Sequence, residues 1–342
     1  MRTGIVSGIL AAALALLLIL GNGVENGPNP FVVLGIVNGA VFGLVALGLV
    51  LVYKGTRVFN FAQGEFGTLA AFIVVFALNR NLPYFVAVIA AILVALLVGL
   101  AFERVVVRPL MNSPRISLLV ATIAFALLAI GFQIIFFKAE PRSMAPMIEG
   151  LDAAGNPRGI DLFGLIIEPQ RLVALGVLIA LGGLLAYFFS RTDLGLAVLA
   201  TSQDAFATRV VGIGVERMSR FIWGAAAVLG AIAGILYVPL TGALVPAVMT
   251  SNILIPAFTA AVLGGMTSLP GAFVGGVVIG VVQAVGLWAG GHFTVTSFDA
   301  ATNADVTRTL QEIIPGVEQV TIFLVLLVVL LARPSGLLGR ET

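Results

Sequence analysis

Apolar stretches of nearly membrane-spanning length follow one another along almost the whole chain. Hydrophobic residues make up 60% of its 342 residues and charged residues only 10%, whereas a soluble domain carries roughly 25% charged residues. A water-soluble fold could not bury so much apolar surface, because a single core stops growing near roughly 250–300 residues. We therefore expect an all-α polytopic membrane protein that forms a single transmembrane domain over residues 1–342.

Ten stretches approach the roughly 20 apolar residues that a helix needs to cross the hydrocarbon core. The third is weakened by polar residues at its start, and the eighth by Pro256 and the pair Gly264-Gly265. We expect the eighth stretch to be broken or re-entrant, and leave open whether it fully crosses. The ten expected spans are 5–22, 31–53, 62–79, 83–103, 116–137, 170–190, 219–239, 250–267, 271–290 and 317–333.

The first of these stretches has a second interpretation. Arg2, an apolar run to Leu20 and the small residues Gly21-Asn22-Gly23 are also typical of a cleavable signal peptide. Cleavage would leave nine spans and would not change the orientation of the others.

Lysine and arginine residues are distributed unevenly between the alternate loops of this ten-span chain. If Arg2 faces the cytoplasm, most of the 18 basic residues do so too, and the positive-inside rule places both termini there. The outer side then holds two polar segments, 139–169 and 291–316, which are either solvated loops or docking surfaces. The long inner segment 191–218 mixes apolar and charged residues, which predicts a short helix at the membrane surface.

Four polar residues, Asn60, Gln63, Glu65 and Thr68, lie close together at the cytoplasmic end of the third span. Ionisable groups at membrane depth usually face a cavity or a partner, because they cost about 2.5–3.5 kcal/mol at the bilayer centre. Two interpretations remain open. One is a structural network in which Glu65 pairs with Arg57 or with the Asn60 amide, and the other is a place on the path of a polar solute.

Isolated polar residues and glycine pairs within the spans are both expected to serve helix packing. Asn38, Gln133, Thr259 and Gln283 are each more often helix–helix hydrogen-bonding groups than ligands, although together they could line a path for a polar solute. Glycine pairs at four-residue spacing let two helix backbones approach closely. These pairs are Gly39/Gly43, Gly230/Gly234, Gly271/Gly275 and Gly276/Gly280.

The composition and motifs exclude several classes of site. The chain has no cysteine and a single histidine, His292, so disulfides, iron–sulfur clusters and thiolate zinc sites are ruled out, and we expect no metal or cofactor. No Gly-x-x-x-x-Gly-Lys-[Ser/Thr] loop is present, so ATP-driven work requires another subunit. The sequence also lacks a nucleophile–histidine–acid set, so we expect no enzyme. The net charge of +2 fits basic loops beside anionic membrane lipid, and we expect no nucleic-acid partner.

Six groups of residues occur in a defined order along the chain. They are Asn38-Gly39 with Ala46-Leu47-Gly48-Leu49, Asn60-Phe61-Ala62-Gln63-Gly64-Glu65, Glu103-Arg104-Val105 with Arg108-Pro109-Leu110, Asp204 to Gly212-Ile213, Phe258-Thr259-Ala260-Ala261-Val262-Leu263-Gly264-Gly265 with Ser268-Leu269-Pro270-Gly271-Ala272, and Arg333-Pro334-Ser335-Gly336-Leu337-Leu338-Gly339. Single groups are weak signals, but the ordered set over roughly 31–339 resembles the permease subunits of branched-chain amino acid ABC importers, the LivH/LivM type, and is closer to LivH.

The resemblance implies that two permeases, each usually from its own gene, pair to form the translocation path in the plasma membrane of a prokaryote. Two cytoplasmic ATPase subunits then power transport, and an external solute-binding protein delivers the substrate. The segment 191–218 matches the coupling loop that docks on the ATPase, as a short helix ended by glycine could act as a lever. The resemblance implies that the residues coupled to the ATPase are Asp204, Ala207, Gly212 and Ile213. The candidates for the translocation path are Asn38, Asn60, Gln63, Glu65, Thr68 and Thr259.

Two positions depart from the family pattern. Gln63 stands where many members have histidine, and Leu196 stands where an arginine is common. The solute therefore stays open between branched-chain amino acids and the urea or short amides that relatives carry. A self-contained secondary carrier is a further alternative, but it would need inverted repeats and an ion site in mid-membrane. A membrane enzyme is a third, and it would need clusters of catalytic side chains that the sequence lacks.

Overall fold

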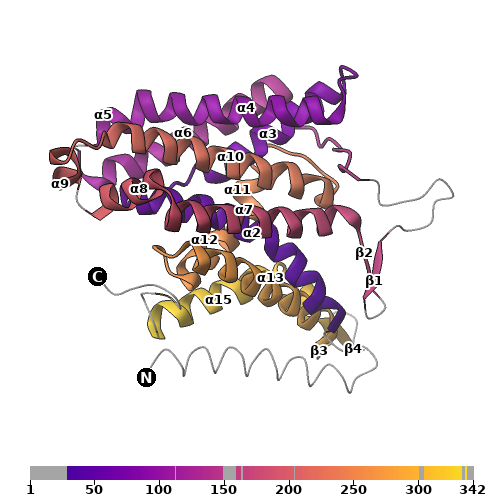
Figure 1. The fold of residues 1–342 in the computed structure, drawn as a ribbon. Helices are drawn as coiled ribbons and strands as arrows, with labels where there is room; N and C mark the ends of the chain where they lie inside the picture. Colours follow the sequence, from indigo (N-terminus) through magenta and orange to yellow (C-terminus); the bar gives the residue numbers. More distant parts are fainter. Residues whose placement is uncertain are drawn as a thin grey trace.

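Long helices make up most of the computed structural model, and two small hairpins project from them (Figure 1). Six of the described helical runs are long and apolar enough to cross a membrane. They are α2 (Asn29–Thr56), the run of α4 (Tyr84–Phe102), η1 (Glu103–Val107) and α5 (Arg108–Leu110), then α6 (Arg115–Phe137), α7 (Pro169–Arg191), α10 (Val215–Thr241) and α13 (Leu269–His292). The structure describes residues 29–111, 113–148, 159–162, 165–203, 205–299, 304–332 and 336.

These helices coincide with six of the expected spans and confirm a polytopic, mainly helical membrane protein. Three further apolar helices are shorter, and they correspond to the third, eighth and tenth expected spans. The expected span 5–22 lies outside the described residues, so the count of ten and the location of the termini stay predictions. The shorter helices are α3 (Gln63–Leu78), α12 (Leu254–Gly264) and α15 (Val317–Ala332).

The fourth expected span, 83–103, ends too early, because the helix continues through a π-helical turn to Leu110. In this turn the Arg108 N–H donates to the carbonyl of Glu103, five residues back. The wider turn lies directly before Pro109, which has no N–H to contribute to a helix. A proline in the sequence is therefore not a reliable stop signal at this position.

The eighth expected span is broken, as its proline and glycines predict. A short helix, α11 (Val248–Asn252), is followed by α12, and Ile253 separates the two with a φ of −113°. Ala247 precedes α11 with a left-handed φ of 63°. The 11 residues of α12 span about 16 Å, roughly half of the ~30 Å hydrocarbon core.

The two expected outer segments contain β-hairpins, which the all-α expectation missed. In the first segment β1 (Ile160–Leu162) pairs antiparallel with β2 (Leu165–Ile167), and Ile160 lies opposite Ile167. In the second, β3 (Thr294–Asp299) pairs with β4 (Ala304–Thr309), which leads into the short helix α14 (Leu310–Ile313). Threonine, valine and isoleucine favour such strands, but these runs are too short to stand out beside the apolar helices.

The long inner segment forms two helices where one was expected. They are α8 (Asp193–Gln203) and α9 (Ala205–Val210), and α10 already begins at Val215. The helix α8 packs against α2, α7 and α10, whereas α9 contacts chiefly α8 and the start of α10. Both lie at the same end of the helix bundle as α5 (Figure 1).

Helix α2 is the centre of the bundle, and every residue from 39 to 52 is buried. It crosses α13 at glycine positions on both helices: a Cβ on Gly39 would lie only 2.6 Å from the Gly276 carbonyl oxygen. A second close crossing joins α3 to α10, where a Cβ on Gly67 would lie 2.7 Å from the carbonyl oxygen of Gly230. The packing role predicted for the glycine pairs at these crossings is confirmed, since only hydrogen fits there.

We expect Gly276→Ala to weaken the crossing of α2 and α13, because its Cβ would collide with backbone atoms of Gly43. Backbone cannot move aside as a side chain can, and overpacking of this kind costs about 1–3 kcal/mol. The measurement is the thermal unfolding midpoint of the purified protein in detergent. Gly183→Ala on α7 is the matched control, because a Cβ there meets nothing within 4 Å. Equal midpoints for the two variants would contradict the packing role.

Candidate functional site

Gln63 is the centre of a buried hydrogen-bond network at the start of α3. Its Nε2 donates to the carbonyl oxygen of Ala226 on α10 (2.8 Å), and its Oε1 accepts from Asn60 Nδ2 (3.0 Å). The Asn60 Oδ1 accepts the Ala62 N–H (3.1 Å), which stabilises the turn that begins α3. Gly48 of α2 leaves room for this amide, because a Cβ there would collide with Gln63 Nε2. The network therefore ties α3 to the two most buried helices.

Glu65 pairs with Gln133 of α6, and the partners expected from the sequence, Arg57 or Asn60, are wrong. Gln133 donates from Nε2 to Glu65 Oε2 (2.7 Å) and accepts the N–H of Ala247 at Oε1 (3.2 Å). Because Ala247 precedes α11, one glutamine joins α3, α6 and the broken eighth span. Gln133 is fully buried, as is expected of a helix–helix hydrogen-bonding group.

The helix period explains why Glu65 turns away from Asn60. Residues two apart on a helix point about 200° apart, so Gln63 and Glu65 face different neighbours. Gln63 faces α10 and Asn60, whereas Glu65 faces α6. The Thr250 hydroxyl on α11 interacts with the Glu65 carboxylate, and neither this hydroxyl nor Glu65 Oε1 forms a hydrogen bond of standard geometry with a described residue. These two groups therefore keep hydrogen-bonding capacity for a polar solute or a water molecule.

Thr68 extends the cluster one turn further along α3. Its hydroxyl donates to the Gly64 carbonyl (3.3 Å) and accepts the N–H of Met249 on α11 (3.3 Å). Thr259 lies on α12 and donates to the carbonyl of Ile255, four residues back (2.9 Å). The structure therefore brings Asn60, Gln63, Glu65 and Thr68 together along α3, while the Thr259 hydroxyl is used within its own helix.

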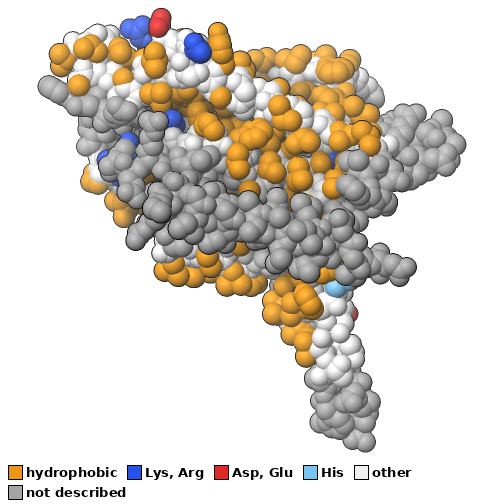
Figure 2. Space-filling model, turned by 60° about the horizontal axis from the view of Figure 1, so that its bottom comes forward, with side chains coloured by type: hydrophobic (Ala, Val, Ile, Leu, Met, Phe, Trp, Pro, Cys, Tyr) orange, Lys and Arg blue, Asp and Glu red, His pale blue; other side chains and the backbone are white. Residues whose placement is uncertain are grey.

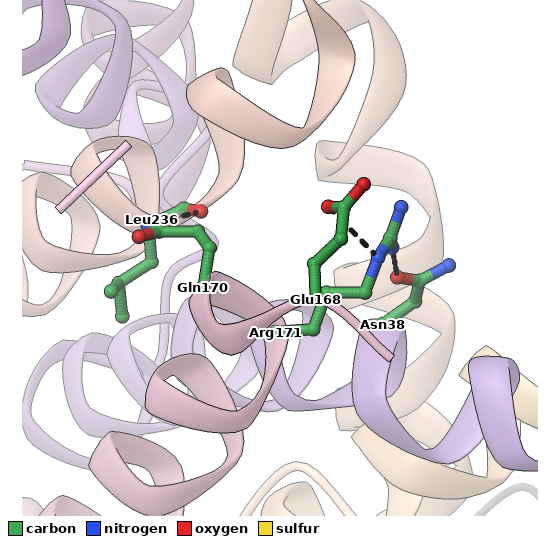
Figure 3. Close-up of polar contacts among 5 residues, drawn as sticks. All are labelled: Asn38, Glu168, Gln170, Arg171 and Leu236. Atoms are coloured by element: carbon green, nitrogen blue, oxygen red, sulfur yellow. Dashed lines mark hydrogen bonds and ion pairs between the residues drawn. The ribbon is translucent and has the colours of Figure 1, made fainter. Parts of the chain in front are cut away.

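Asn38 belongs to a second cluster, with charged residues at the start of α7 (Figure 3). The Arg171 guanidinium donates to Asn38 Oδ1 and lies 3.6 Å from Glu168 Oε2. Asn38 lies ten residues before Gly48 on α2, roughly 15 Å along the helix axis from the Gln63 network. The six path candidates are therefore divided between separate places in the membrane.

Gln170 and Arg171 were missed, because the sequence shows them only as the polar edge of a span. Gln170 is buried, donates to the Leu236 carbonyl on α10 (3.2 Å) and accepts the Met147 N–H (3.0 Å). Figure 3 shows the two side chains pointing away from each other, Gln170 toward α10 and Arg171 toward α2. A usable signal was the pair of long polar side chains directly after Pro169, at the first turn of an apolar helix.

Glu103 is a second buried carboxylate, at the π-helical turn after α4. It is 0% exposed, and neither oxygen has a hydrogen-bond partner among the described residues. The Trp223 ring packs against Phe102 at 5.2 Å, and its Nε1 likewise lacks a partner there. The sequence marked Glu103 only as part of a motif. No group of three or more His, Cys, Asp or Glu residues that could hold a metal ion exists within the described parts of the chain.

Three of the four residues expected to couple to an ATPase, Ala207, Gly212 and Ile213, lie on α9 or directly after it. Asp204 is outside the described residues, whereas Ala207 is exposed on α9. Gly212 lies in the turn after α9 with a left-handed φ of 84°, and the Ile213 N–H donates to the Thr208 carbonyl (3.1 Å). This end of α9 exposes Val210 and Val211, each 72% accessible, next to Gly212.

Comparison with known proteins gives the family of the chain. Residues 31–331 match the family described as the branched-chain amino acid transport system permease component. This chain belongs to that permease family. It is 29% identical to the high-affinity branched-chain amino acid transport system permease protein BraD of Pseudomonas aeruginosa, over 90% of this chain and 94% of BraD. It is 26% identical to LivH of Salmonella typhimurium over the same shares, and 29% identical to the probable LivH of Methanocaldococcus jannaschii over 71% of this chain and 76% of that protein.

Membership in this permease family confirms the resemblance drawn from the ordered motifs. Like its relatives, the permease is a transmembrane transport subunit and not an enzyme. ATPase and solute-binding partners follow in general from the ABC permease family. The polar clusters of a transport subunit serve helix packing or solute passage rather than catalysis.

We expect Gln133→Leu to destabilise the permease, because it leaves the Glu65 carboxylate buried without its hydrogen-bond donor. An unsatisfied buried polar group costs about 1–3 kcal/mol, and more if it is charged. The conservative Glu65→Gln variant keeps an acceptor for Gln133 and removes the charge, so it should retain the thermal midpoint of the parent. The measurement is thermal unfolding in detergent for each variant. If the Gln133→Leu protein is as stable as the Glu65→Gln protein, the hydrogen bond between Gln133 and Glu65 contributes nothing to thermal stability.

Proposed function

We propose that this chain is the permease subunit of an ATP-driven importer for branched-chain amino acids or similar small polar solutes, in the plasma membrane of a prokaryote. The observation that carries the proposal is the family match across residues 31–331, together with named amino acid permeases that align over 90% of the chain. The positive-inside distribution supports an orientation with both termini in the cytoplasm.

The ATPase subunits are proposed to dock on segment 191–218. Three features support this assignment: α9 contacts little of the bundle, Val210 and Val211 are exposed at and just after its last residue, and Gly212 in the following turn has a conformation that favours glycine. Exposed apolar residues beside a charged surface are typical of an interaction site. Because α8 packs on α2, α7 and α10, movement of this segment would reach three spans directly.

The solute path is proposed to pass the polar face of α3 and the broken helix α11. Support comes from the buried Glu65 carboxylate and the Thr250 hydroxyl beside it, because Glu65 Oε1 and this hydroxyl form no hydrogen bond of standard geometry with a described residue. Non-helical backbone at membrane depth, as at Ile253, is tolerated where it is enclosed by protein or lines a cavity. Asn60, Gln63 and Thr68 then act mainly by fixing α3 in place, since their polar atoms bond to neighbouring helices and turns.

A second, LivM-like permease subunit and an external solute-binding protein complete the proposed importer. The binding protein sets specificity at the first step, so the alternative of urea or short amides remains a second candidate for the solute. Gln63, which stands where the resemblance leads one to expect histidine, leaves the solute open between the two candidates. Substrate binding by the partner protein distinguishes the two candidates.

We expect Gly212→Val to uncouple ATP hydrolysis from uptake while the complex stays at normal abundance. Its φ of 84° costs a side-chain-bearing residue about 1–2 kcal/mol, so the end of α9 would change shape. Gly242→Val is the matched control. Gly242 has a φ of 72° and, as at Gly212, a Cβ there would meet nothing within 4 Å, but Gly242 follows the last residue of α10 whereas Gly212 precedes the first. Uptake and ATPase activity are measured side by side. If both variants lose uptake equally, or if neither loses it, Gly212 has no specific role in coupling.

Affinity purification of the intact protein from its native membrane tests the proposed assembly. We expect an ATPase and a second permease to co-purify in near-equal amounts, because this chain lacks a nucleotide-binding loop. Mass spectrometry of the eluate identifies both. A chain that purifies alone and moves solute down an ion gradient would identify a secondary carrier instead.

A further inference from the structure

An apolar groove of about 770 Å³ runs along the bundle surface between α4, α7 and α10. Its walls are leucine side chains of α4 and α7, such as Leu96 and Leu184, and its floor includes the small residues Gly224 and Ala225 of α10. The groove therefore faces the lipid side of helices that are each long enough to cross the membrane. Figure 2 shows how extensively apolar side chains cover the surface between the ends of the molecule.

Three arginines, Arg104, Arg217 and Arg220, line one end of this groove. All three are exposed, and none forms an ion pair with a described residue, although Arg108 and Glu216 close by pair with each other. Arg220 makes only a long contact, 3.5 Å, from its Nε to a backbone carbonyl of its own helix. The guanidinium groups are therefore free to bind an anion from outside the chain.

The depth of the groove matches one leaflet of a bilayer. Its apolar lining on α10 extends from Phe221 to Ile232, a rise of eleven residue steps or about 16 Å at 1.5 Å per residue. Half of the ~30 Å hydrocarbon core is about 15 Å, so acyl chains would fill this length and a headgroup would lie at the arginines. The arginine end is also the end at which α8 and α9 lie, the one expected to face the cytoplasm.

We infer that this groove binds an anionic phospholipid of the cytoplasmic leaflet, with its phosphate on Arg104, Arg217 and Arg220 and its acyl chains between α4, α7 and α10. Basic pockets between membrane helices on the cytoplasmic side suit anionic headgroups. Arginine is favoured for this task, because its planar fork binds phosphate through two hydrogen bonds. The bound lipid would hold the start of α10 beside α4, next to the proposed ATPase-docking segment. The inference does not depend on the transported solute.

Native mass spectrometry of the purified protein tests the inference, with dioleoyl-phosphatidylglycerol and dioleoyl-phosphatidylcholine as probes with identical acyl chains. We expect preferential binding of phosphatidylglycerol, and we expect Arg217→Gln/Arg220→Gln to weaken it by at least about five-fold, as each arginine near a headgroup contributes about that factor. Arg115→Gln/Arg191→Gln removes the same charge outside the groove and should keep the preference. Ala225→Phe fills the floor while all the arginines remain, and should also reduce phosphatidylglycerol binding.

Three results would overturn the inference. Equal binding of the two lipids to the parent protein would mean that only bulk lipid surrounds the groove. Equal loss in the control pair would mean that total charge, not the groove, attracts the lipid. If the groove variants instead separate the permease from a co-purifying subunit, with lipid binding unchanged, the groove is a subunit contact. Because the measurement is lipid binding, a failure here leaves the proposed transport function untouched. A failure of the transport experiments would likewise leave the lipid inference untouched.

Discussion

Contact between helix backbones at glycine positions determines how the helices around α2 can pack. Lipid tails are as apolar as leucine, so burial of apolar surface does not drive these helices together and close van der Waals packing must do so. Gly39 and Gly276 bring α2 against α13, and Gly67 and Gly230 bring α3 against α10. Crossings this close leave little space between helices, so polar side chains at the same depth must find partners inside the protein.

The polar side chains meet that requirement by joining helices that are distant in the sequence. Gln63 bonds to α10, Gln133 joins Glu65 of α3 to the start of α11, and Arg171 joins α7 to α2. The short helix α3 and the broken helix α11 are thus held by directional bonds, while the outer faces remain apolar. Buried oxygens left unpaired among the described residues, on Glu65 and Glu103, stand out against this pattern.

The sequence predicted the long spans, the break in the eighth span and the glycine crossings, because each has a local signal: length, proline or four-residue spacing. It did not predict which polar residues would meet. Glu65 was expected beside Arg57 or Asn60, but its partner Gln133 lies 68 residues away, and only the tertiary fold brings the two together. The pairing of Arg171 with Asn38, 133 residues away, was missed for the same reason.

The proposed function requires that a chain without a nucleotide-binding loop import a small polar solute on the energy of ATP hydrolysed by partner subunits. The test is uptake of radiolabelled leucine into proteoliposomes that contain the purified complex, with the binding protein and leucine outside and the ATPase subunits facing the lumen. We expect uptake only when ATP is supplied on the ATPase side, and none with a non-hydrolysable analogue. Uptake without ATP, driven by a proton or sodium gradient, would contradict it.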